Sequence, residues 1–173
     1  MPFTLLKPDG IDLSQTFAFT GSVSGAGGGK IGQVVHSKDT TLRNINNNTF
    51  VTCMSVTITP SATSSKILVL GSPNLSKDTN NTAVMHKVIR VVGGSDVATQ
   101  VLSDHTARTG STNLTHSDVG YAAFQWYDQP SSTAAITYDY RIASQANNGN
   151  VVFNNYSSNG TFSSQITAME ILA

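Results

Sequence analysis

The feature that most constrains the fold of this chain is an alternation of apolar and polar residues with a period of two. In Ile136–Ala143, written ITYDYRIA, apolar and aromatic residues alternate with Thr, Asp and Arg. Phe50–Thr59 alternates in a similar way, with most of its apolar residues at even positions. Because neighbouring side chains of a strand point to opposite faces of a sheet, both segments predict half-buried β-strands.

Further segments have the composition of strands and are separated by turn residues. They are Ile31–His36, Ser65–Leu70, Val84–Val92, Val97–Leu102, Val119–Tyr127, Val151–Asn154 and Ser164–Leu172. Clusters of Gly, Pro, Asn or Ser lie between them, among them Gly93-Gly94, and we find no convincing amphipathic helix. Eight or nine short strands of this kind predict an all-β protein, an antiparallel β-sandwich, and a jelly roll suits the number of strands.

The composition favours the same fold class and excludes several partners. Ser, Thr and Asn, which favour turns and strands over helices, make up about a third of the chain. The formal net charge is zero, so no basic surface indicates nucleic-acid binding. No apolar run approaches the ~18 residues of a membrane span, and no secretory signal is recognised. We expect synthesis in a cytoplasm, without membrane insertion.

Three runs are apolar on both faces for part of their length. They are Lys66–Leu70, Met85–Val92 and Ile166–Ala173. One face of each sheet in an antiparallel sandwich normally meets water. A second apolar face therefore predicts contact with neighbouring subunits, although a strand that lies under a long loop gives the same pattern.

Residues 1–29 differ from the rest of the chain. They contain a Pro8-Asp9-Gly10 turn signal, a short strand-like segment at 16–23 and a glycine tract, with too little apolar material for a core. We predict an extended docking arm with a Gly-rich hinge at 1–29 and a jelly-roll domain at 30–173. The apolar residues expected to dock are Phe3, Leu5, Leu6, Ile11, Leu13, Phe17 and Phe19.

The glycine tract GAGGGK, which ends at Lys30, has the look of a phosphate-binding loop. The P-loop pattern requires a glycine where this chain has Ser24 and a hydroxyl residue where it has Ile31. The pattern also requires a helix after the lysine, because the helix N-terminus completes the anion site, whereas a strand is predicted here. We therefore interpret the tract as a hinge.

The histidines show no metal-ligand spacing. His105 and His116 share the polar segment 103–118 with Asp104 and Asp118, and such a group could hold a metal ion in a loop. The interpretation as solvated loop histidines is preferred. We predict neither a metal nor a cofactor.

No catalytic pattern emerges from the remaining reactive residues. Cys53 lies in the middle of a predicted strand, where a cysteine is more often a small core residue than a nucleophile. Asp104, Asp118 and Asp139 are scattered, so no glycosidase pair can be named. Glu170 is predicted to lie on the solvent face or to pair with a strand arginine, Arg90 or Arg141. We expect a protein that is not an enzyme.

Five aromatic residues on strand segments allow two interpretations. They are Tyr121, Trp126, Tyr127, Tyr138 and Tyr140. A row of exposed aromatic side chains would form a platform on which sugars stack. Aromatic residues at alternating strand positions more often belong to the core, which is the preferred interpretation.

Several stretches together resemble a recurrent structural protein of tailed bacteriophages, in particular marine and cyanobacterial phages. They are KIGQVV (30–35), ITPSATSSKILVL (58–70), FQWYDQPSSTAAITYDYRI (124–142) and SSQITAMEILA (163–173), and DGIDLSQTFAFTGSVSGAGG (9–28) resembles the linker before such domains. The resemblance covers nearly the whole chain. It implies a trimeric, tumour-necrosis-factor-like or related jelly roll at the virion surface, as a tail-fibre tip, an appendage or a capsid decoration.

We therefore expect a homotrimeric virion protein whose arm docks on tail or capsid proteins. A tail fibre or appendage is preferred, and a capsid decoration (cement or head fibre) is the alternative, since no long shaft precedes the domain. A polysaccharide depolymerase and a purely structural plug are less favoured. On a tail, polar loops would bind host cell-surface glycans weakly one by one and strongly through multivalency. The candidate glycan contacts are His105, Arg108, Asn113, His116, Asn147, Asn148 and Asn159.

Overall fold

The computed structural model describes residues 30–77, 83–106, 120–145, 149–154, 156–157 and 160–172. The predicted docking arm, including every residue named from Phe3 to Phe19, lies outside these ranges and stays a prediction. So does the division of the chain at residue 29.

The described chain is built from strands. Eight of them form the body: β1 (Ile31–Asp39), β3 (Val51–Ile58), β4 (Lys66–Ser72), β6 (Val84–Val92), β7 (Ser95–Thr106), β9 (Phe124–Asp128), β10 (Ile136–Ser144) and β14 (Ser164–Ile171). Six are shorter: β2 (Arg43–Ile45), β5 (Asn74–Lys77), β8 (Gly120–Tyr121), β11 (Val151–Phe153), β12 (Tyr156–Ser157) and β13 (Gly160–Thr161). Among the described residues no helix is long and apolar enough to cross a membrane.

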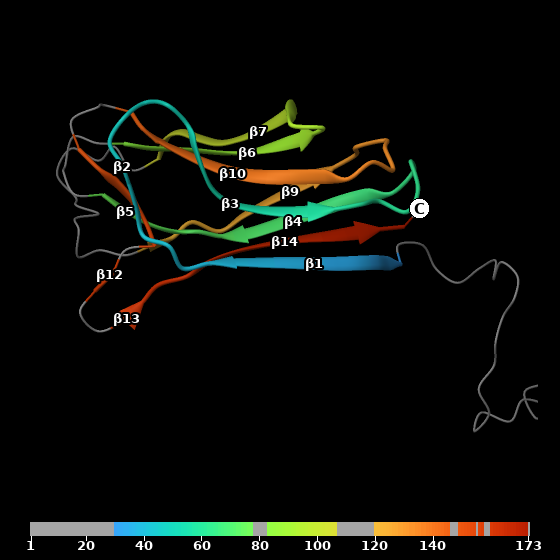
Figure 1. The fold of residues 1–173 in the computed structure, drawn as a ribbon, viewed down its shortest axis with the longest axis horizontal. Coiled ribbons are helices and arrows are strands. Elements are labelled where there is room, and N and C mark those ends of the chain that lie inside the picture. The colour runs from blue at the N-terminus through green and yellow to red at the C-terminus, as the bar shows by residue number, and fades with distance from the viewer. Residues whose placement is uncertain are drawn as a thin grey trace, which may run out of the picture.

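The body strands form two four-stranded antiparallel sheets that pack into a sandwich (Figure 1). We call β1-β14-β4-β9 the first sheet and β3-β10-β6-β7 the second sheet. If the eight body strands are numbered along the chain, the sheets have the orders 1-8-3-6 and 2-7-4-5. This interleaving is the strand order of a jelly roll, so the predicted fold class is confirmed.

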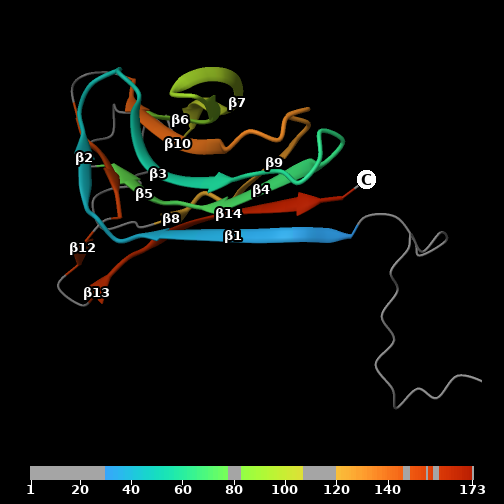
Figure 2. The same cartoon turned by 45° about the vertical axis from the view of Figure 1, so that its right-hand side comes forward.

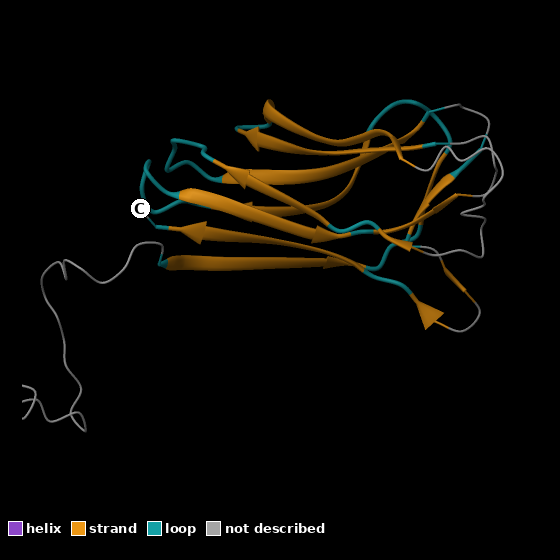
Figure 3. Ribbon diagram, turned by 180° about the vertical axis from the view of Figure 1, so that it is seen from behind, coloured by secondary structure: helices purple, strands orange, loops and turns teal. Residues whose placement is uncertain are grey.

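A third sheet, β2-β11-β5-β8, lies at one end of the sandwich, together with the β12–β13 pair (Figures 2 and 3). Asn154 connects this end sheet to the body. Its backbone has a φ of 54°, which asparagine tolerates, and its Nδ2 donates to the Asp39 carbonyl at 3.0 Å. The Ser164 hydroxyl donates to Asn154 Oδ1 at 2.7 Å, and Asp39 forms an ion pair with Arg43 at 2.9 Å. Side-chain bonds thus hold the chain where it passes between sheets.

Aromatic and branched side chains fill the space between the two body sheets. Tyr138 and Tyr140 are fully buried, and the Phe124 ring stacks on Tyr140 with the ring centroids 5.3 Å apart. Phe124 reaches this position by crossing the backbone of Gly71, where an added Cβ would lie 2.1 Å from its ring. The glycine is therefore required by packing.

The turn between β6 and β7 agrees with its sequence signal. Val92 pairs with Ser95, which leaves Gly93 and Gly94 as a two-residue connection. Both have positive φ values, 58° and 82°, as a type I′ hairpin requires.

Candidate functional site

The predicted glycan contacts fall where the structure gives no side-chain description. His105 belongs to β7, but its side chain is not described. Arg108, Asn113, His116, Asn147, Asn148 and Asn159 all lie outside the described residues. Within the part of the chain that is described, no group of three or more His, Cys, Asp or Glu side chains could hold a metal ion. The glycan contacts remain predictions.

The most distinctive surface is the outer face of the first sheet. Cross-strand pairing places four apolar side chains in one line across its strands: Val34, Met169, Leu68 and Tyr127. We call this line the apolar row. Its two ends are on edge strands, where Val34 is 56% and Tyr127 55% exposed, while Met169 and Leu68 are half-buried.

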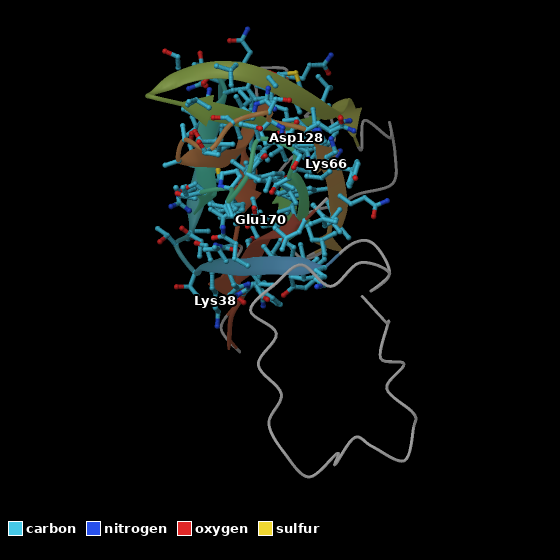
Figure 4. The ribbon with its side chains drawn as sticks, turned by 90° about the vertical axis from the view of Figure 1, so that its right-hand side faces the viewer. Lys38, Lys66, Asp128 and Glu170 are labelled. Carbon is cyan, nitrogen blue, oxygen red and sulfur yellow. The ribbon has the colours of Figure 1, made fainter. Side chains whose placement is uncertain are left out.

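The apolar surface continues beyond one side of the row, where Ile31 pairs with Ile171. On the other side Leu70 is the apolar member of a cross-strand line that is otherwise polar, with His36, Thr167 and Gln125. Two lysines lie at opposite ends of the face: Lys66 is paired with Ile171, and Lys38 with Gln165 (Figure 4). The middle of this face is therefore uncharged, and its charges lie at the margins.

Two shallow hollows flank Leu70. The larger, of about 410 Å³, is lined by Leu70, Ala123, Phe124 and Gln125. The smaller, of about 180 Å³, is lined by Leu70, Gly71, Ser72, Gln165 and Thr167. The larger one arises where β9 begins after Ala122-Ala123, a break that the predicted single strand Val119–Tyr127 did not include.

The outer face of the second sheet is more polar. Arg141 bonds both oxygens of Asp96, at 2.7 and 2.8 Å, and also Asp139 at 2.9 Å. The hydroxyls of Thr57 and Thr137 lie 2.8 Å apart. These hydroxyls and paired charges share the face with the apolar side chains of Ile89, Val91 and the exposed Val101, so the face is mixed.

Two of the three runs that are apolar on both faces lie in the first sheet. The runs at 66–70 and 166–171 form the central strands of the first sheet, and their second apolar sides, with Leu68 and Met169, lie on its outer face. The run at 85–92 does not fit the asymmetry between the two sheets, because it lies in the second sheet and its second apolar side, with Ile89 and Val91, is on that sheet's outer face.

Glu170 corrects both sequence-based expectations, because it neither faces solvent nor pairs with an arginine. It is 1% exposed and lies between the layers (Figure 4). Ser61 donates to Glu170 Oε1 from its backbone N–H at 2.6 Å and from its hydroxyl at 2.7 Å, and Gln33 Nε2 donates to Oε2 at 2.9 Å. Burial by itself would raise the pKa, but the hydrogen bonds from Gln33 and Ser61 outweigh it and lower the pKa to about 2.

The arginines pair with other carboxylates. Arg90 Nη1 bonds both oxygens of Asp128, at 2.8 and 2.9 Å, and the Tyr138 hydroxyl donates to Asp128 Oδ2 at 2.7 Å. Burial first, and then this bond to Asp128, raise the pKa of Tyr138. The pair joins β6 of the second sheet to β9 of the first. The sequence contained a hint of this pair, because Arg90 and Asp128 stand at alternating positions of their strands that otherwise hold inward-facing residues.

Cys53 is a buried core residue, as preferred from the sequence. It is 2% exposed, and burial raises the pKa of its thiol to about 12, so it stays protonated. His86 is buried beside the Tyr140 hydroxyl at 2.9 Å, and burial lowers the pKa of its imidazole to about 4. Both groups are neutral at physiological pH, and their contacts indicate a structural role.

The aromatic residues divide between core and surface. Tyr138 and Tyr140 are buried, and Trp126 packs edge-on against Tyr138 with the centroids 5.5 Å apart. Tyr121 and Tyr127 are 56% and 55% exposed, but they belong to different sheets. The core interpretation therefore holds for three of the five residues.

No protein-family model matches the sequence, and no curated protein matches it. Among solved structures, the chain is similar to the VP2 subviral particle of infectious bursal disease virus, with 13% identity over 82% of this chain and 37% of that protein, and a TM-score of 0.49. T=1 particles derived from the same virus give 12% identity over 80% of this chain and 38% of that protein, with a TM-score of 0.49. The chain thus spans well under half of these proteins.

Proposed function

We propose that this chain is a structural protein of a virion surface, built as a homotrimer of jelly rolls and attached through residues 1–29. The observation that carries the proposal is the continuous apolar row on the outer face of the first sheet, set against the outer face of the second, where charges and hydroxyls separate the apolar side chains. Monomeric proteins rarely expose a continuous apolar patch, and such patches mark surfaces that bind other proteins. A sandwich with one apolar and one more polar outer face is suited to a subunit that assembles on one side and meets water on the other. The resemblance of the sequence to phage structural proteins supports the same role.

The place in the virion is proposed as a tail fibre or appendage, with capsid decoration as the alternative. Mass spectrometry of purified virions, calibrated against the major capsid protein, tests both. A few dozen copies or fewer support the appendage, and hundreds support decoration. Absence of the protein from purified virions would overturn the proposed function.

The docking arm is tested by deleting residues 1–29. We expect the truncated chain to fold and assemble but to be lost from virions. Replacing only Phe17 and Phe19 by serine is a milder variant, which should lower incorporation without shortening the chain. Full incorporation of both variants would refute the docking role.

Host recognition is proposed for the polar loops. Asn147→Ala with Asn148→Ala should weaken adsorption of virions to host cells, because amide groups hydrogen-bond sugars. The exposed Ser55→Ala on the second sheet serves as the matched control. Unchanged adsorption of the loop variant would place glycan binding elsewhere or remove it.

A further inference from the structure

We infer that the outer face of the first sheet is the surface through which copies of this chain contact one another. In this contact, Tyr127 of one copy enters the hollow beside Leu70 of the next. The inference rests on the proposed function, because it assigns the interface of the proposed trimer.

The first argument is the continuity of the apolar row. Pairing in register carries it across all four strands, from Val34 through Met169 and Leu68 to Tyr127. Because the row reaches both edge strands, each of the four strands exposes an apolar side chain on this face. Burying it against a neighbour removes this surface from water, which is the main favourable term in association.

The second argument is shape. Tyr127 projects from β9, and the larger hollow is lined by Phe124 and Gln125 of the same strand and by Ala123 just before it. A protruding ring and a hollow therefore lie two to four residues apart along one edge strand. A neighbouring copy, related by a three-fold axis close to β9, can receive the ring in its hollow and insert its own ring into a third copy. Such a head-to-tail contact closes into a trimer, and the presence of ring and hollow on one chain is the reason to assign the face to further copies of the same chain.

The third argument is charge. Among the described residues on this outer face there is no acidic side chain, and Lys38 and Lys66 lie at its margins. Lys66 Nζ already donates to Gln129 Oε1 at 2.9 Å. An apolar centre with a polar margin is the usual anatomy of a protein–protein interface.

The size of the face is sufficient. Four strands about seven residues long cover roughly 20 by 23 Å, on the order of 450 Å² for one copy. In a trimer each face is shared between two neighbours, and the three faces together would bury on the order of 1,400 Å².

The experiment compares assembly of the full chain with that of single variants by sedimentation equilibrium at micromolar concentration. The wild-type chain is expected to be a trimer. Leu68→Glu places a carboxylate in the middle of the face and should sediment as a monomer. Tyr127→Ala removes only the inserted ring and should weaken assembly by about tenfold or more. Because Tyr127 is 55% exposed, this variant tests the interface even if Leu68→Glu does not fold.

The matched control is Val101→Glu on β7, an edge strand of the second sheet. Val101 is apolar and 49% exposed, close to the exposure of Tyr127, and this variant should remain a trimer.

A double variant, Ala123→Cys with Tyr127→Cys, in a Cys53→Ser background should form disulfides between chains on mild oxidation.

Failure of the proposed interface and failure of the proposed virion role give different results. A wild-type trimer that persists in Leu68→Glu and Tyr127→Ala overturns the assignment of the face, while virion incorporation still tests the function. Dissociation of Val101→Glu as well would also overturn it. A monomeric wild-type chain would overturn the trimer together with the interface.

Discussion

Two buried carboxylates of the first sheet are stabilised in different ways. On one side, Glu170 of β14 is bound by the neutral donors of Ser61 and Gln33. On the other side, Asp128 of β9 is bound by the Arg90 guanidinium and the Tyr138 hydroxyl. Asp128 joins the two sheets, because Arg90 and Tyr138 belong to the second sheet, whereas Glu170 is bound by Gln33 of β1 in its own sheet and by Ser61 in the connection between β3 and β4. Both carboxylates are nearly inaccessible to water. The comparison shows that a buried charge can be stabilised by aligned dipoles as well as by an opposite charge, and that the two solutions fail differently.

The largest effect is expected on the side with the charge pair. Asp128→Ala leaves the Arg90 guanidinium, whose side chain is only 17% exposed, without its counter-ion. The free energy of unfolding should fall by about 3–5 kcal/mol, because an unpaired buried charge is costly. Urea denaturation at a fixed chain concentration measures it. Arg90→Met with Asp128→Ala should recover most of the loss, and a loss below about 1 kcal/mol for the single variant would contradict this account.

A smaller effect is expected at the neutral site. Glu170→Gln keeps one acceptor oxygen but turns its amide toward the donor groups of Gln33 or Ser61. The free energy of unfolding should fall by about 1–3 kcal/mol, less than for Asp128→Ala, because no charge is left unpaired. Gln165→Ala, an exposed position on the same strand, is the control and should change stability by less than about 0.5 kcal/mol. If Glu170→Gln costs more than Asp128→Ala, the ranking of the two sites is wrong.

His86 and Glu170 should destabilise the fold in two different ranges of acidic pH. Folding lowers the pKa of His86 from its ordinary value of 6.5 to about 4. The unfolded chain therefore binds more protons between these values, and stability is lost as the pH falls from 6.5 towards 4. For Glu170, with a pKa of about 2 against an ordinary 4.5, the loss continues from 4.5 towards 2. Melting temperatures measured from pH 6.5 to pH 2 test this. In His86→Gln the melting temperature should fall less between pH 6.5 and 4, and in Glu170→Gln it should fall less between pH 4.5 and 2. An unchanged profile in both variants would refute the assignment.

The smallest effect is expected at the surface ion pairs. Arg141→Met removes bonds to Asp96 and Asp139 on the outer face of the second sheet, where Asp96 is 49% exposed. Stability should fall by less than in Asp128→Ala and Glu170→Gln, and by still less at high salt, because water reaches this outer face and screens the pair with Asp96. Thermal unfolding at low and high salt measures this difference. A loss as large as that of Asp128→Ala would mean that the outer face of the second sheet is covered in solution.

The strands predicted most closely are those with a clear period of two. Ile136–Ala143 became β10 almost without change, and the Gly93-Gly94 turn has the geometry that its residues favour. The segment at β5, NLSK, was missed because three of its four residues are polar, yet all four are buried between β11 and β8. Its burial comes from neighbours distant in the chain, which no local pattern contains.

The candidate surface was partly predictable. Apolar residues on both faces of 66–70 and 166–173 indicated that a second face would be covered, but not which strands would share it. Glu170 was misplaced for the same reason. When both parities of a strand are apolar, as at Met169 and Ala168, alternation does not tell which side faces the interior.

Local sequence alone therefore determined that this chain is an all-β sandwich with a glycine hairpin and a core cysteine, because alternation, turn chemistry and burial preference act over a few residues. Tertiary structure decided the rest. The jelly-roll order brings β1, β14, β4 and β9 into one register, and only that register turns Val34, Met169, Leu68 and Tyr127, far apart in the chain, into one row. It also selects neutral donors for Glu170 and a guanidinium for Asp128. The physical reason is that a strand specifies its two faces locally, whereas its neighbours are specified by the packing of the whole domain.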